Sequence, residues 1–326
     1  MGSASFPAIH TSEHIRAIDL ARDLDPVADL IELCFPIHQD PDGQTYIQEM
    51  RKAAREMRLI GWLAGLSEQY LGQSTGFVWV ENGQIVGNLS LIPLNKNGRR
   101  IYLIANVAVH PEHRRRGIAR RLTQKALSFL ARQNESQVWL QVRDDNPAAI
   151  GLYTSLGFSE QASRTTWRIR PRDFNPAGVP TGAALSVRRW ARCDWSLHQT
   201  WLEEAYPHNI QWNLPVHFQR FSPGIFQAVS NYLDGTKLKS WTVFAGNACQ
   251  GVITWQKTTT YANNLWLAFP ADREEDTLPG GMRYVLKRLS PSHPFSVDYP
   301  KGRFSDQFTA LGFFEFRTLN WMRREL

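Results

Sequence analysis

The alternation of apolar and polar residues along the first 170 positions predicts a succession of helices and strands. Apolar residues recur at helical spacing after Asp25 and Pro26, which are suited to the cap and the first position of a helix. Further helices are expected over residues 46–63, 118–132 and 147–156. Strands are expected over residues 75–81, 85–94, 101–109, 138–142 and 165–170. This order predicts an α/β (α+β) fold, with a mixed, mostly antiparallel central sheet flanked by helices.

Three motifs of the first half recur in the second half in the same order. Residues 83–91 resemble residues 247–255, residues 106–111 resemble residues 265–270, and the Leu-Gly-Phe of residues 156–158 returns at residues 311–313. Matches in register indicate a duplicated domain. We therefore expect a first domain over residues 1–172, a Pro- and Gly-rich linker over residues 173–184 and a second domain over residues 185–326.

Composition narrows the class of protein. The chain has 326 residues, of which 43% are hydrophobic and 21% charged, and its mean hydropathy is -0.37. These values are typical of a globular protein and exclude a collagenous, disordered or disulfide-rich chain. No apolar stretch approaches the ~18 residues of a membrane span.

The cysteines and the first residues suggest a cytoplasmic protein. Residues 1–9 lack the basic start and apolar run of a signal peptide. Cys34, Cys193 and Cys249 are few, odd in number and far apart, so we expect reduced thiols that serve in packing.

The net charge of +7 raises the question of nucleic-acid binding. Residues 1–170 hold 20 Lys and Arg against 17 Asp and Glu, and the rest of the chain holds 17 against 13. Neither half is strongly basic, and the one dense cluster covers only residues 114–121. A short cluster suits one polyanionic small molecule better than a nucleic-acid duplex, so no nucleic-acid partner is expected.

That basic cluster lies where a strand gives way to a helix, which suits a bulky anion. Backbone N–H groups at a helix start lack an intrahelical acceptor, and the helix dipole adds positive potential there. Glycine lets the backbone come close to the anion, and arginines can add charge-assisted hydrogen bonds. A pyrophosphate fits this arrangement, although a solvated turn has similar residues. The candidate binding residues are Val107, Ala108, Val109, Arg114, Arg115, Arg116, Gly117, Ile118 and Ala119.

These residues resemble the acetyl-CoA signature of the GNAT N-acetyltransferase superfamily. Arg114, Gly117 and Ala119 carry its Arg-x-x-Gly-x-Ala pattern. Downstream, the segment from Asn146 to Phe158 matches the superfamily motif Asn-x-x-Ala-x-x-x-Tyr-x-x-x-Gly-Phe throughout. The first half is most similar to the branch that acetylates protein N-termini, including those of ribosomal proteins. The resemblance implies two tandem GNAT-like folds.

The resemblance also implies how the site works, with acetyl-CoA as co-substrate and no metal. The pantetheine arm would pair with the backbone of residues 107–109 between two splayed strands, and the pyrophosphate would lie on residues 115–119. Asn146 would contact the cofactor, and it is also a good N-cap before Pro147. Tyr153 would be the general acid that protonates the departing thiolate, and it could equally serve only in packing.

One part of the superfamily pattern is missing. Asn106 and Gln141 stand where a carboxylate base is common, and an amide takes no proton at neutral pH. Either Glu32, Asp40 or Glu49 supplies the base, or water relays the proton. An acceptor of low pKa needs least help, since an α-amino group titrates near ~8 and lysine near ~10.4.

The second copy has the features of a degraded site. Residues 273–276 read Arg-Glu-Glu-Asp. They stand where the first copy has its basic cluster, and their carboxylates would repel a pyrophosphate. Phe308 replaces Tyr153, and Pro279 with two glycines is expected to delay the helix to residues 282–289. A structural role without cofactor is expected, and a second ligand site lined by Trp and Tyr is the alternative.

The leading hypothesis is an acetyl-CoA-dependent N-acetyltransferase that acts on a primary amine of a small molecule or peptide N-terminus by direct attack. The alternative is a catalytically silent acyl-CoA-binding sensor or scaffold. A longer donor such as succinyl-CoA is also open. No membrane partner is expected, and the chain is expected to be a monomer or homodimer.

Overall fold

The computed structural model describes residues 14–64, 76–96, 98–175, 177, 185–189, 193–289 and 293–326. Contacts within the chain divide it into two compact units. The first unit contains residues up to 94, residues 99–140 and the last three residues, and the second contains residues 95–98 and 141–323. None of the helices in these described ranges is long and apolar enough to cross a membrane.

The first unit is built on five neighbouring strands in the order β1-β2-β3-β4-β5. They are β1 (Ile15–Ala17), β2 (Gly76–Glu81), β3 (Gln84–Lys96), β4 (Arg99–Val109) and β5 (Gln137–Arg143), of which β5 runs on into the second unit. The β1–β2 and β2–β3 pairs are antiparallel, whereas β4 and β5 are parallel. The expected mixed sheet is therefore confirmed, and β1 is an additional strand that its short length hid in the sequence.

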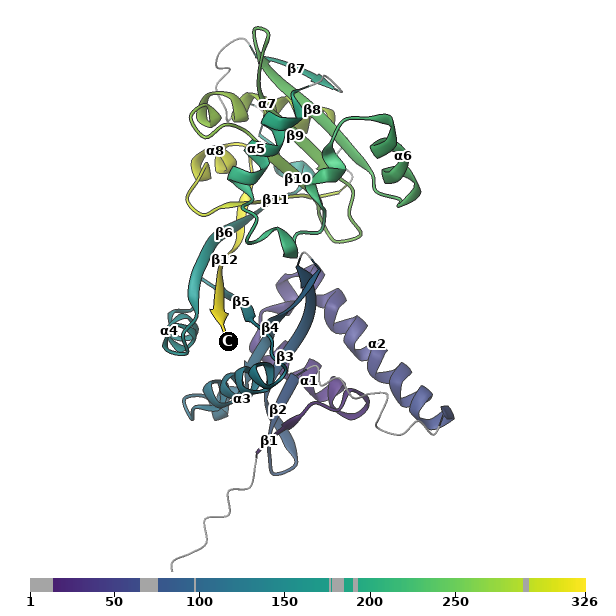
Figure 1. The fold of residues 1–326 in the computed structure, drawn as a ribbon, viewed down its shortest axis with the longest axis vertical. Coiled ribbons are helices and arrows are strands. Elements are labelled where there is room, and N and C mark those ends of the chain that lie inside the picture. Colours follow the sequence, from purple (N-terminus) through teal and green to yellow (C-terminus); the bar gives the residue numbers. More distant parts are fainter. Residues whose placement is uncertain are drawn as a thin grey trace, which may run out of the picture. The chain divides into compact units, whose positions relative to one another are not determined.

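Three helices flank these strands, and Figure 1 shows α2 and α3 on opposite sides of them. They are α1 (Leu20–Cys34), α2 (Pro41–Ala64) and α3 (Ile118–Arg132). The expected bounds of α3 are confirmed. Gly117, in a left-handed conformation, precedes the helix, and Ile118, Leu122 and Leu130 form its buried stripe.

The expected start of α1 at Pro26 is wrong, since the helix begins six residues earlier and Pro26 lies inside it. The Asp19 carboxylate accepts hydrogen bonds from the N–H groups of Ala21 and Arg22, and the Asp23 carboxylate accepts one from the Asp19 N–H. These bonds satisfy the first turn before the proline is reached. The helix expected from residue 46 likewise begins earlier, at Pro41.

The second unit contains seven neighbouring strands in the order β12-β6-β11-β10-β9-β8-β7. They are β6 (Ser159–Ile169), β7 (Leu185–Arg189), β8 (Leu238–Ala245), β9 (Ala248–Gln256), β10 (Asn263–Ala268), β11 (Phe295–Pro300) and β12 (Phe314–Glu325). Its β12–β6, β6–β11, β10–β9, β9–β8 and β8–β7 pairs are antiparallel, whereas β10 and β11 are parallel. The second unit thus repeats the mixed sheet of the first.

The described residues of the second unit contain five α-helices. They are α4 (Pro147–Ser155), α5 (Trp195–Ala205), α6 (Ile225–Leu233), α7 (Glu274–Arg288) and α8 (Ser305–Ala310). Short 3₁₀ helices occupy Ile37–Gln39 and Pro111–His113 in the first unit and Pro171–Asp173, Gln211–Asn213 and Phe218–Phe221 in the second. The core of the second unit is aromatic, with buried Trp167, Trp201, Trp241 and Trp266 in one cluster. Tryptophan in this half therefore builds core, as aromatic residues usually do.

The expectation that Pro279 and its two glycines delay α7 is wrong. The helix begins at Glu274 and continues through all three residues. A Cβ on Gly280 would come within 2.8 Å of Leu185 Cδ1, and one on Gly281 within 2.8 Å of Val243 Cγ2. These glycines allow close packing rather than a helix break.

Strand pairing within the second unit joins the two sequence repeats. β6, which ends the first repeat, lies between β11 and β12 of the second repeat, and Figure 1 shows β6 and β12 running side by side. The compact units therefore follow strand pairing rather than chain order. The sequence division at residues 172 and 185 remains our proposal for the duplication itself, and most of the proposed linker (176 and 178–184) lies outside the described residues.

The expectation of three reduced cysteines is wrong for two of them. Cys193 and Cys249 form a disulfide that ties the start of α5 to β9, and Cys34 is the free cysteine of the described chain. Their separation of 56 residues in sequence concealed that they are neighbours in space.

Candidate functional site

The end of β4 leaves backbone available for a ligand. The parallel pairing of β4 with β5 covers three residue pairs and ends at Ile104 and Leu140. Asn106 then adopts a left-handed conformation with φ of 51°, which is uncommon for residues other than glycine and asparagine. Residues 107–109 follow this irregularity, and Ala108 is buried at 2% exposure. The strand is thus turned away from regular pairing at the point where the sequence predicts pantetheine contacts.

A neutral polar cluster holds Asn106 in place. The Asn88 side-chain amide donates to the Asn106 carbonyl over 2.8 Å, and the Asn106 amide donates to the Tyr46 hydroxyl over 2.6 Å. Ser90 Oγ accepts weaker bonds from both amides. Asn88 is fully buried, and its Oδ1 has no hydrogen-bond partner among the described residues. No sequence pattern predicts the roles of Tyr46 and Asn88, because their contacts with Asn106 depend on tertiary packing.

The turn after β4 presents an open helix N-terminus. Gly117 is the N-cap of α3, with φ of 78° and no side-chain cap. A Cβ built on it meets nothing within 4 Å, so the space in front of the helix is free. The N–H groups of Ile118 and Ala119 lie in the first turn, which contains no acidic residue. This end of α3 therefore offers backbone donors and positive potential to an anion.

The three arginines before Gly117 differ in what they contact. Arg114 Nε donates to the Val109 carbonyl over 3.1 Å, and Arg116 makes two bonds of 3.0 and 2.9 Å to the Glu81 carboxylate. A hydrogen bond from Trp79 and the Arg116 guanidinium lower the pKa of Glu81, which keeps this carboxylate charged. Arg115 is exposed, has φ of 62°, and makes no side-chain hydrogen bond or ion pair within the described residues. Arg114 and Arg116 thus brace the turn, and Arg115 is left to meet a ligand.

The Asn146–Phe158 segment lies in the second unit and is described within that unit. Asn146 Oδ1 accepts from the Ala149 N–H over 3.1 Å, so its expected N-cap role is confirmed. Gly157 ends α4 with φ of 83°. Tyr153 is buried against Phe158, and burial raises the pKa of its hydroxyl to about 12. The hydroxyl is therefore protonated throughout the physiological range.

The corresponding place in the second copy is filled by the protein's own side chains. The parallel pairing of β10 with β11 covers only the pairs Asn263–Phe295 and Asn264–Ser296 of these described strands. Beyond it, the Leu267 N–H donates to the buried Tyr206 hydroxyl over 3.3 Å. Leu267 corresponds to Ala108 in the repeat. Tyr206 therefore takes the backbone donor that a pantetheine arm would need.

The start of α7 is also occupied. Glu274 is its first residue, is 3% exposed, and is paired with Arg303. A carboxylate at a helix N-terminus satisfies the same potential that a phosphate would. Phe308, which replaces Tyr153, is completely buried among aromatic rings. In the second copy, buried side chains of the protein thus occupy the positions at which the first copy has exposed backbone.

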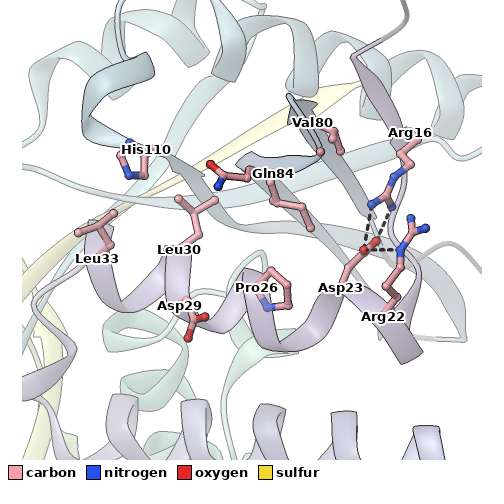
Figure 2. A pocket seen from close by; sticks show the side chains of 12 residues that line it. Arg16, Arg22, Asp23, Pro26, Asp29, Leu30, Leu33, Val80, Gln84 and His110 are labelled. Atoms are coloured by element: carbon pink, nitrogen blue, oxygen red, sulfur yellow. Dashed lines mark hydrogen bonds and ion pairs between the residues drawn. The ribbon is translucent and has the colours of Figure 1, made fainter.

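A groove of about 680 Å³ in the first unit runs beside α1, opposite the β2–β3 turn (Figure 2). Apolar Pro26, Leu30 and Val80 line its middle, and Arg16 and Arg22 bind the buried Asp23 at one end. His110 lies at the other end. None of the predicted site residues lines this groove, so it is separate from the helix N-terminus of α3.

The three candidate bases, Glu32, Asp40 and Glu49, do not form a cluster with one another. Glu32 and Asp29 both pair with Arg51, Asp40 accepts from the Asp42 N–H near the start of α2, and Glu49 is an exposed residue of α2. The described residues contain no group of three His, Cys, Asp or Glu that could hold a metal ion.

Comparison with known families identifies the first repeat. Residues 25–158 match the Acetyltransferase (GNAT) family model. This part of the chain is a GNAT domain. Its resemblance in sequence, inferred from the two motifs, is therefore confirmed.

Curated relatives match the same region. The [ribosomal protein bS18]-alanine N-acetyltransferase of Escherichia coli is 40% identical over 62 residues, which are 19% of this chain and 42% of that protein. The N-alpha-acetyltransferase RimI of Mycobacterium tuberculosis is 33% identical over 102 residues, which are 31% of this chain and 59% of that protein. The chain thus spans about half the length of these relatives.

The tandem fold has a structural counterpart. The crystal structure of a GCN5-related N-acetyltransferase from Sphaerobacter thermophilus aligns over 95% of both chains, with a TM-score of 0.55 and 16% identity. At this identity the likeness shows the fold alone, and it extends through the second repeat.

Proposed function

We propose that this protein transfers an acetyl group from acetyl-CoA to a primary amine, with one active site in the GNAT domain. The observation that carries the proposal is the open N-terminus of α3, where Gly117 has no side-chain cap and leaves free space beside the backbone N–H groups of Ile118 and Ala119. Acetyl-CoA would supply the acyl group as an activated thioester. Its diphosphate suits this helix end in charge and size.

The chain's own residues would divide the binding between backbone and side chains. The backbone of Val107, Ala108 and Val109 would pair with the amides of the pantetheine arm, and the N–H groups from Arg115 to Ala119 would hold the diphosphate. The Arg115 guanidinium is exposed and would add a charge-assisted bond. Arg114 and Arg116 would act through the shape of the turn, since both are already engaged.

The acceptor that fits best is an amine of low pKa, such as a peptide N-terminus. The described side chains hydrogen-bonded to Asn106 are all neutral, so this cluster contains no group that would deprotonate a lysine. An α-amino group is largely neutral near pH 8 without such help. The names of the two relatives, which refer to alanine and N-alpha acetylation, support the same acceptor class.

Tyr153 is our proposed general acid, on the strength of its place in the motif from Asn146 to Phe158. With a pKa of about 12 it holds its proton at neutral pH and can donate it as a thiolate departs. Asn146 is proposed as a cofactor contact in addition to its capping role. We also propose that the second copy binds no cofactor.

Thiol release from acetyl-CoA over a panel of peptides and lysine amines tests the proposal. We expect peptide N-termini to be acetylated faster than lysine side chains, and Tyr153→Phe to lower kcat about 100-fold with little change in the KM for acetyl-CoA. Tyr102→Phe removes the hydroxyl of a buried tyrosine in β4 and is the matched control. A protein that binds acetyl-CoA but releases no thiol with any amine would instead be the silent acyl-CoA-binding sensor.

A further inference from the structure

Helix α6 exposes an apolar stripe to solvent. Ile225, Phe226, Val229, Tyr232 and Leu233 are 82, 94, 51, 83 and 77% exposed. They are five of the eleven large apolar side chains that are exposed in the described chain, and they all lie on one helix of nine residues. Scattered exposed apolar residues are ordinary, but a contiguous stripe marks an interaction surface.

The opposite side of α6 is fixed to the second unit, so the stripe is held outward. Asn231 Nδ2 donates to the Arg220 carbonyl over 2.9 Å, and Gln227 Nε2 donates to Asn231 Oδ1 over 3.1 Å. Arg220 also forms a 2.8 Å ion pair with Asp234, which directly follows the helix. The orientation of the apolar face therefore follows from polar contacts on the other face.

The spacing of the stripe is symmetric about Val229. A pair of large apolar residues lies three and four positions before it (Phe226 and Ile225), and another pair lies three and four positions after it (Tyr232 and Leu233). When two copies of such a helix pack antiparallel about a two-fold axis at Val229, each end pair meets the opposite end pair of its partner. The smallest of the five side chains then lies at the closest approach of the two helices.

Area and charge favour a second copy of this chain over other occupants. The five side chains expose on the order of 600 Å², which is most of the roughly 800 Å² that each partner contributes to a standard interface. α6 contains no charged residue, so self-pairing opposes no like charges. Helices that bind membrane surfaces are rich in Lys and Arg on the polar face, and α6 has neither.

We propose that this protein is a homodimer in which the α6 helices of two copies pack antiparallel, with Val229 on the two-fold axis. The apolar ends of each helix cover those of its partner. The N-terminus of each α6 lies near the C-terminus of the other, which is a favourable arrangement of helix dipoles.

Sedimentation velocity of the full chain over a concentration series tests the interface. The wild type is expected to be dimeric at micromolar concentration, and Val229→Glu is expected to raise the dimer dissociation constant at least about 100-fold. Leu197→Glu alters a side chain that is 46% exposed on α5 and should leave the dimer intact. A monomeric wild type, or dimers that persist in Val229→Glu, would overturn the proposal.

The two-fold axis has its own test. Val229→Lys alone should be monomeric, as Val229→Glu should be, because like charges would face each other across the axis. An equimolar mixture of the two variants should restore a dimer that contains one of each, detectable by native mass spectrometry. A mixture that stays monomeric contradicts the position of Val229 on the axis. Co-flotation of the wild type with vesicles of anionic phospholipid, lost in Val229→Glu, would assign α6 to a membrane instead and refute the dimer.

Discussion

At the scale of single residues, backbone conformation matters more to the candidate site than side-chain chemistry does. Asn106, Arg115 and Gly117 all have positive φ, between 51° and 78°, and they bracket the segment proposed to bind acetyl-CoA. Asparagine and glycine reach this region most easily, whereas arginine is uncommon there. The motif residues therefore shape a surface of main-chain donors rather than a set of reactive groups.

Gly117→Ala tests that surface directly. Alanine is strained at φ of 78°, and its methyl group would project into the free space where the diphosphate is proposed to lie. We expect the Kd for acetyl-CoA, measured by calorimetry, to rise at least about tenfold, with a stability loss of about 1 kcal/mol.

Gly83→Ala is the matched control for that variant, because Gly83 has φ of 79° and an equally open Cβ position in the β2–β3 turn. It should lose similar stability and bind acetyl-CoA as the wild type does. Equal affinities for the two variants would show that the diphosphate does not approach Gly117.

The burial of His198 is expected to make the stability of the second unit decrease at acidic pH. Burial lowers its pKa to about 4, between Trp195 and Phe221, whereas an unfolded histidine titrates near ~6.5. The unfolded chain therefore binds a proton first as pH falls, and this histidine's contribution to stability is present above pH ~6.5 and lost towards pH ~4. The loss from this residue between pH 7 and pH 5 is about 2 kcal/mol.

Urea denaturation at pH 7 and pH 5 measures this effect. His198→Leu should show a smaller loss on acidification than the wild type by about that amount. His208→Leu replaces a histidine that is 74% exposed and should keep the wild-type pH dependence. If the His198→Leu and His208→Leu curves shift equally with pH, His198 is not titrating as described.

At the scale of elements, local pattern predicts what local interactions decide. The bounds of α3 follow from its apolar stripe and from Gly117, and both are visible in the sequence. The start of α1 depends on hydrogen bonds of Asp19 and Asp23, which are also local. The prediction placed the start at Pro26 instead, because proline is common at the first position of a helix. The positions of β6 beside β11 and β12 depend on pairs of residues that are at least 126 positions apart in sequence, which no periodicity encodes.

The glycines of α7 illustrate the same limit, because tertiary packing overrides their low helix propensity. Gly281→Ala would place a methyl group 2.8 Å from Val243 Cγ2 and 3.2 Å from Ile253 Cδ1, both on buried side chains. We expect it to lower the free energy of unfolding by about 1–2 kcal/mol. Thermal or urea denaturation measures the change.

Gly151→Ala is the counterpart in α4, where an added Cβ meets nothing within 4 Å. Alanine has the higher helix propensity, so this variant should gain about 0.5–1 kcal/mol. Opposite signs for the two helix glycines are the expected result, and a stabilising Gly281→Ala would contradict the packing described for α7.

At the scale of the whole molecule, duplication explains both what the sequence predicts of the site and what it conceals. The basic cluster of residues 114–121 and the Asn146–Phe158 motif are each recognisable in the sequence, because the residues of each lie close together along the chain. Tyr46 and Asn88 contact Asn106 from α2 and β3, and Glu81 contacts Arg116 from β2, so only the fold reveals these three residues. The proposed loss of the second site rests in the sequence on its acidic residues, whereas the hydrogen bond of Tyr206 to the Leu267 N–H is visible only in the structure.

The duplicated fold leads to a prediction about stoichiometry. The two repeats offer two helix N-termini after parallel strand pairs, but α7 begins with the buried Glu274 paired with Arg303, and Tyr206 holds the Leu267 N–H. A ligand at α7 would have to displace the buried Glu274 carboxylate from the half-buried Arg303. Calorimetry should therefore find one acetyl-CoA per chain.

Substitution of an arginine before α3 and of an arginine before α7 tests which repeat holds the acetyl-CoA site. Arg115 precedes α3 with its guanidinium exposed, and Arg273 is the N-cap of α7 and is 61% exposed. Because a phosphate contact from an exposed arginine is charge-assisted but screened, Arg115→Ala should raise the Kd for acetyl-CoA roughly three- to tenfold at low salt and less at high salt. Arg273→Ala should leave the Kd unchanged at either salt concentration. Binding of two molecules per chain, or a weaker affinity only in Arg273→Ala, would mean that the second repeat has kept a cofactor site despite Glu274 and Tyr206.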